Sequence, residues 1–75
     1  MNKNMKEEIV NIIKTEMVQA KNLLCYIRNM IVSKESQKLK SEDPVTFCEL
    51  LTFYEETERH NNEVKKIASR LGMSD

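Results

Sequence analysis

The chain has 75 residues and a mass of 8.8 kDa, and this length leaves room for only one domain. It contains one glycine, one proline and no tryptophan, too few turn-forming residues for a β-sandwich or barrel. Twelve basic and twelve acidic side chains give a formal net charge of zero. That balance argues against a nonspecific nucleic-acid binder, because such proteins are strongly basic. Residues 1–75 are therefore predicted to form a single all-α domain.

The first predicted helix covers residues 4–36, where nothing in the sequence breaks a helix. Its apolar residues recur every 3.5 residues on average and form a seam: Val10, Ile13, Met17, Ala20, Leu24, Ile27 and Ile31. A second apolar stripe lies about 90° away on the same helix. Its members are Met5, Ile9, Ile12, Leu23, Tyr26 and Met30. The apolar arc is wider than one neighbouring helix can cover.

The second predicted helix covers residues 44–71, after a polar connection over residues 37–43. Asp43 followed by Pro44 is typical of an N-cap and a first helical residue, and Gly72 is a natural stop. The seam of this helix consists of Phe47, Leu50, Tyr54, Thr57, Asn61, Val64, Ala68 and Leu71. The short connection makes the two helices antiparallel neighbours, so an antiparallel two-helix hairpin is predicted.

The second stripe predicts a partner, because monomers rarely expose apolar patches of several hundred Å². The simplest partner is another copy in a symmetric homodimer, which gives a four-helix bundle. A heteromeric partner and a folded-back monomer are the alternatives. The residues expected at the interface are Ile9, Ile12, Leu23, Tyr26, Met30, Phe53 and Ile67.

A polar layer is predicted near the middle of the hairpin. Thr57 and Asn61 occupy seam positions where apolar residues are expected, and His60 flanks that seam. The antiparallel register brings Glu16 to the same level. Such a layer most often fixes register and oligomeric state. Solvent exposure, or a ligand or proton-sensing site at His60, are the alternatives.

No metal, cofactor or catalytic residue is expected. Glu56, His60 and Glu63 share one face of the second helix, but di-iron bundles need Glu-x-x-His pairs and facing carboxylates. Cys25 and Cys48 lie in neither a Cys-x-x-Cys motif nor a Cys/His cluster. Two cysteines without a disulfide framework favour a reduced, cytoplasmic setting. Charged residues interrupt the N-terminal segment, so neither a signal peptide nor a membrane span is predicted.

One local segment has a counterpart in a known family. Residues 63–74, with the sequence EVKKIASRLGMS, resemble the first helix and turn of a bacterial helix-turn-helix. There an Ile-Ala-x-x-Leu-Gly-Met-Ser string precedes the recognition helix. The resemblance covers twelve of the 75 residues and implies DNA reading if the chain is a remnant or fragment of a longer regulator.

The expected function is that of a small, non-enzymatic interaction or regulatory protein, bacterial or phage in origin. It would bind an unidentified protein through its helix surfaces, as a homodimer. The alternative is a nucleic-acid-binding hairpin dimer, similar in architecture to the plasmid copy-control hairpins that bind RNA with one bundle face. Lys14, Lys21 and Arg28 recur at seven-residue spacing and are its candidate contacts.

Overall fold

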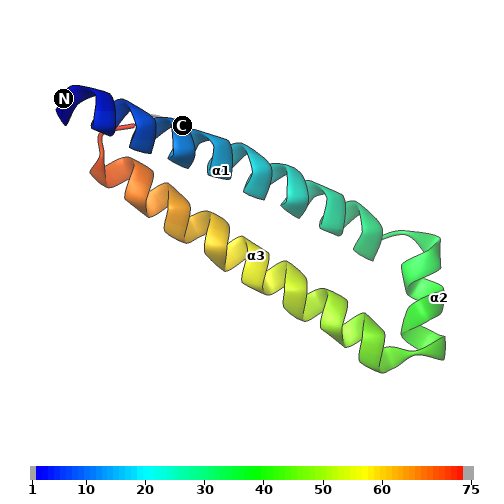
Figure 1. Ribbon diagram of the computed structural model, residues 1–75. Coiled ribbons are helices and arrows are strands. Elements are labelled where there is room, and N and C mark those ends of the chain that lie inside the picture. The colour runs from blue at the N-terminus through cyan, green and yellow to red at the C-terminus, as the bar shows by residue number, and fades with distance from the viewer. Residues whose placement is uncertain (1, 74–75) are drawn as a thin grey trace.

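The computed structural model describes residues 2–73 and, within them, the side-chain burial of residues 5–73. The described residues form three α-helices and no strand: α1 (Asn2–Ile31), α2 (Lys34–Glu42) and α3 (Pro44–Arg70). Figure 1 shows α1 and α3 running antiparallel side by side, with α2 across the end where they are joined. The all-α prediction is confirmed, whereas the prediction of two helices is wrong.

The predicted first helix over 4–36 is interrupted at Ser33. The backbone of Ser33 is extended, with φ −70° and ψ 157°. Its hydroxyl donates a hydrogen bond to the Met30 carbonyl (2.6 Å) and accepts one from the Ser36 N–H (3.2 Å). Ser33 therefore satisfies the Met30 carbonyl with both its hydroxyl and its backbone N–H (3.1 Å) and caps the start of α2.

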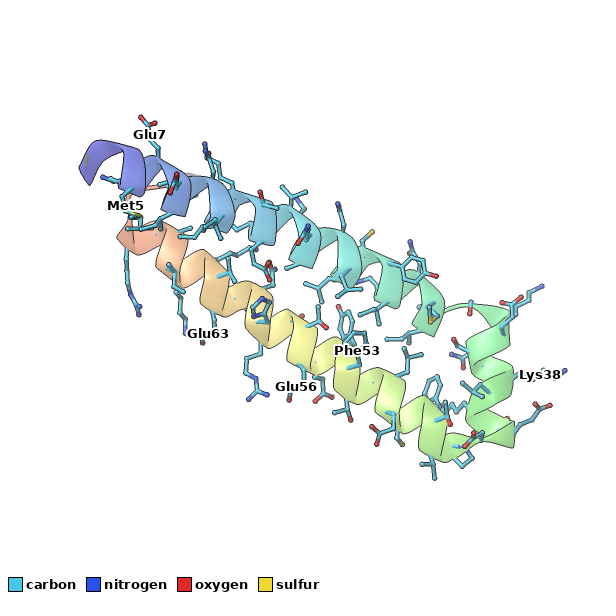
Figure 2. The ribbon with its side chains drawn as sticks, in the orientation of Figure 1. Met5, Glu7, Lys38, Phe53, Glu56 and Glu63 are labelled. Carbon is cyan, nitrogen blue, oxygen red and sulfur yellow. The ribbon has the colours of Figure 1, made fainter. Side chains whose placement is uncertain are left out.

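Most of the connection predicted over residues 37–43 is helical, because it belongs to α2. On the inner side of α2, Ser36 is buried and Leu39 half-buried, and the Lys40 ammonium lies 5.9 Å from the centroid of the Phe47 ring. Figure 2 shows Lys38 on the outer side, pointing away from α1 and α3. The short helix thus packs across the start of α3.

Both ends of α3 follow the predicted signals within one residue. The Asp43 carboxylate accepts hydrogen bonds from the Thr46 N–H (3.2 Å) and the Thr46 hydroxyl (2.6 Å). Gly72 has φ +75°, a left-handed conformation that favours glycine. The N–H of Gly72 donates to the Ser69 carbonyl and the N–H of Met73 donates to the Ala68 carbonyl. These two bonds form a Schellman motif, which accounts for Gly72 as a helix stop.

The interior lies between the two predicted seams, and every seam residue is buried or half-buried. The buried apolar residues are Ala20, Ile27, Phe47, Val64 and Ala68. Ile27 is the one large side chain among the described residues that is only 2% exposed. This is a thin interior for a rod of 56 × 17 × 15 Å, since chains of this size are marginal as single folding units.

None of the helices in residues 2–73 is long and apolar enough to cross a membrane.

Candidate functional site

One side of the α1/α3 pair carries a row of exposed apolar side chains. Their exposed fractions lie between 38% and 67%. We call this side the apolar face, and its members are Ile9, Ile12, Leu23, Tyr26, Met30, Phe53 and Ile67. They are the residues that the sequence predicts at an interface, and the structure places all seven at the surface.

A contact between the helices shows that these residues share one side. His60 Nε2 donates to Glu16 Oε1 across a distance of 2.6 Å. Glu16 belongs to a row at seven-residue spacing on α1: Ile9, Glu16, Leu23 and Met30. His60 belongs to such a row on α3: Phe53, His60 and Ile67. The Glu16–His60 contact therefore brings the two rows side by side.

The same contact sets the levels along the apolar face. Ile9 lies seven residues before Glu16, and Ile67 lies seven residues after His60. Because α1 and α3 are antiparallel, Ile9 and Ile67 lie at the same level. Leu23 and Phe53 correspond in the opposite direction. The apolar face therefore has an apolar level, a polar level and a second apolar level in succession.

The polar level opens into a shallow pocket of about 300 Å³. The pocket is lined by Glu16, Gln19, Ala20, Leu23, Glu56, Thr57 and His60. The side chains of Glu16 and His60 are 44% and 55% exposed, so their hydrogen bond is open to water. Thr57 is buried beneath them, and its hydroxyl donates to the Phe53 carbonyl at 2.8 Å.

Asn61, the fourth residue of the predicted polar layer, lies on the other side of the α3 seam. Its side chain is 6% exposed and lines a separate pocket of about 380 Å³ with Met17, Val18, Lys21 and Lys65. Asn61 Oδ1 is buried and has no hydrogen-bond partner within the described residues. A buried acceptor without a partner is costly and therefore requires an explanation.

The three basic residues predicted as a nucleic-acid face lie on the opposite flank of α1. Lys14, Lys21 and Arg28 each precede a member of the Glu16 row by two residues, a rotation of about 200°. The Arg28 guanidinium donates hydrogen bonds from Nε and Nη2 to the Tyr54 hydroxyl, at 3.3 and 3.1 Å. This hydrogen bond raises the pKa of Arg28 above its ordinary value. The sequence pattern missed this contact, because periodicity assigns Tyr54 to the seam and Arg28 to the solvent.

The segment that resembles a helix-turn-helix forms the last turns of α3 and its C-terminal cap, and Ser74 lies outside the described residues. Val64 and Ala68 of this segment are buried. Within residues 2–73, no group of three or more His, Cys, Asp or Glu side chains is arranged to hold a metal ion. Glu56 forms an ion pair with Arg59.

No protein-family model, no curated protein and no solved structure matches the chain.

Proposed function

We propose that this chain is a small, non-enzymatic interaction protein that acts through its helix surfaces and assembles as a homodimer. The observation that carries this proposal is the apolar face, where seven large apolar side chains are each 38% to 67% exposed on one side of the molecule. Contiguous apolar patches on small proteins mark protein contacts. The apolar face is therefore the proposed contact surface, and its seven apolar side chains carry no catalytic group.

The thin interior supports the same proposal. Full burial of one large apolar side chain contributes about 1.5–3 kcal/mol, so burial of the exposed half contributes about 1 kcal/mol. A symmetric dimer that meets at the apolar face would bury the seven side chains that are exposed on each copy. Their sum is comparable with the loss of translational and rotational freedom on association, about 4–15 kcal/mol. Two copies that meet at the apolar face place four long helices around one core, as in a four-helix bundle.

Sedimentation equilibrium at tens of micromolar protein tests this proposal. We expect the wild type to have a mass of twice 8.8 kDa. The double variant Leu23→Glu, Met30→Glu should sediment at 8.8 kDa, because two unpaired carboxylates per copy would be buried in the contact. Val18→Glu is the matched control, since Val18 is 58% exposed on the opposite flank of α1, and it should remain dimeric. A wild-type mass of 8.8 kDa would overturn the homodimer.

A second candidate function is nucleic-acid binding through the opposite flank. The observation in its favour is that Lys14, Lys21 and Arg28 are exposed along one line of α1, and that Lys65 of α3 lines the same pocket as Lys21. Rows of basic side chains bind phosphates by charge neutralisation. Arg28 remains a cation in this row, although its guanidinium is hydrogen-bonded to the Tyr54 hydroxyl.

A further inference from the structure

Two symmetric dimers can bury the apolar face. Because the same face of both copies meets, the two-fold axis lies in the plane of contact. If the axis runs along the rod, each α1 faces the partner's α3, and both α2 helices lie at the same end. We call this the parallel dimer. If the axis runs across the rod, α1 faces the partner's α1 and the α2 helices lie at opposite ends, which we call the crossed dimer.

We infer that the second copy docks in the parallel dimer and that the Glu16–His60 pairs of the two copies stack on each other, an inference that rests on the homodimer proposed above. A rotation about the long axis keeps every residue at its own level. The polar level of one copy therefore meets the polar level of the other, and the two apolar levels meet their own counterparts. Leu23 and Phe53 pack on the same residues of the partner subunit.

Charge at the polar level favours the parallel dimer. There, each Glu16 lies between its own His60 and the partner's His60, so that carboxylate and imidazole alternate around a ring of four side chains. Glu16 Oε1 already accepts from its own His60, which leaves Oε2 for a second donor. In the crossed dimer, Glu16 faces the partner's Glu16 and His60 faces the partner's His60. Two carboxylates in direct contact at an interface repel each other.

A shift of the crossed dimer along the rod does not remove this conflict. If the axis crosses at another level, the Glu16–His60 pair meets the apolar Leu23 and Phe53 level of the partner. The hydrogen-bonded pair is then desolvated without a new hydrogen-bond partner, which is unfavourable.

The outer edges of the two helices provide an independent observation. Glu56 and Glu63 are about 60% exposed, and Figure 2 shows both pointing away from α1. They lie four residues before and three residues after His60, so the crossed dimer places Glu56 beside the partner's Glu63. Glu56 and Glu63 form ion pairs with Arg59 and Lys66 of the same helix. These pairs are exposed and therefore weak, so they offset little of the repulsion between the two carboxylates.

The corresponding edge of α1 is uncharged at this level. It presents Ile12, Gln19 and Tyr26, all of them exposed. The parallel dimer places the acidic edge of α3 along this uncharged edge of the partner's α1. Both the ring and the edges therefore select the same arrangement.

Spin-label distances test the arrangement. Cys25 and Cys48 are free and exposed, so each is first replaced by serine. A label is then attached through Lys38→Cys, a position on α2 whose side chain is 75% exposed. In the parallel dimer, the two labels lie at the same end of the rod, within about two molecular widths of 17 Å each. In the crossed dimer, Glu16 to Ile31 already spans about 22 Å at 1.5 Å per residue, and doubling puts the labels about 45 Å or more apart.

A label at Asn62→Cys is the matched control, because this exposed position lies near the polar level and gives in both dimers a short distance, of at most about two molecular widths of 17 Å each. A short distance at both sites supports the inference. A short distance at position 62 with a long one at position 38 overturns the parallel dimer and leaves the homodimer standing. The loss of any coupling at both sites, together with a monomer mass, overturns both proposals.

A charge exchange tests whether the polar levels of the two copies stack. Glu16→Lys gives a cationic polar level and His60→Glu gives an anionic one, so each variant alone should lose about tenfold or more in dimer affinity. An equimolar mixture should recover dimers that contain one copy of each. If either variant alone dimerises as tightly as the wild type, the two polar levels do not stack and the inference fails.

Discussion

The carboxylate of Asp43 ties the first turn of α3 to the chain before it. Hydrogen bonds from the Thr46 hydroxyl and the Thr46 N–H lower the pKa of Asp43 below its ordinary value. Because the pKa is lower in the folded chain than in the unfolded chain, the stabilisation is fully present above the unfolded value of about 3.9. It is lost as the pH falls through the folded value.

We predict that acidification lowers the melting temperature of the wild type more than that of Asp43→Asn. Asparagine caps a helix about as well as aspartate but does not titrate, so the two proteins should melt alike at pH 7. Circular dichroism melts between pH 7 and pH 2 provide the comparison. An equal loss in both proteins would show that the charge of Asp43 contributes nothing to the cap.

Asn61, in contrast to Asp43, is a polar side chain that lacks a hydrogen bond. Its Oδ1 is buried without a hydrogen-bond partner in the described part of the chain. Leaving such a group unpaired costs about 1–3 kcal/mol. We predict that Asn61→Leu raises the melting temperature and also permits assemblies other than the dimer, because a polar seam residue restricts pairing at a cost in stability.

The matched control for this prediction is Asn62→Leu, one residue along and exposed. It should leave both the melting temperature and the sedimentation mass unchanged. If Asn61→Leu melts lower than the wild type and keeps a single dimeric mass, the Asn61 amide is otherwise satisfied and does not act as a register device.

At the scale of the helices, α3 shows how much a sequence can reveal. Asp43, Pro44 and Gly72 act through local hydrogen bonds and backbone preferences, so both ends of α3 were predictable from neighbouring residues. The seams were also predictable, because an apolar period near 3.5 residues leaves one face for burial. The exposure of the apolar face follows from the width of the same arc.

The helix α2 shows where this reasoning stops. Residues 32–36 contain neither glycine nor proline, so the sequence does not mark Ser33 as a break. The segment after Ser33 has Leu39 as its single large apolar residue, and a largely polar helix gives a weak amphipathic signal. Its helical state depends on the Ser33 cap and on packing against the start of α3, as with Ser36, which is buried. Neither contact can be derived from spacing.

The candidate site divides in the same way. The antiparallel register alone brings Glu16 to the level of His60, and the structure joins them at 2.6 Å. The hydrogen bond from Arg28 to Tyr54 depends on side-chain length and orientation. A helical wheel shows neither, so it could not predict this contact. Thr57 and Asn61 look equivalent in the seam, yet Thr57 bonds to the Phe53 carbonyl whereas Asn61 Oδ1 has no partner.

For the whole molecule, the two flanks of the seam have opposite characters. The apolar face lies on one flank, and Lys14, Lys21 and Arg28 lie on the other. In the proposed dimer, the apolar faces meet and each copy turns its basic row outward. The two rows then lie on opposite outer sides of the bundle, so one nucleic-acid strand meets a single row.

A single row binds few phosphates, and this sets the expectation for nucleic acid. Each phosphate that a cation neutralises contributes about −0.9 to the slope of log affinity plotted against log salt concentration. Three cations therefore give a slope of about −2.7. The net charge of zero adds no attraction from the rest of the surface.

We therefore predict no salt-dependent binding of RNA or duplex DNA between about 50 and 200 mM salt, measured by fluorescence anisotropy. The triple variant Lys14→Glu, Lys21→Glu, Arg28→Glu should keep the dimer mass, because these residues lie outside the apolar face. Wild-type binding with a slope near −2.7 that the triple variant loses would transfer the function to the basic row, and the apolar face would then serve assembly alone.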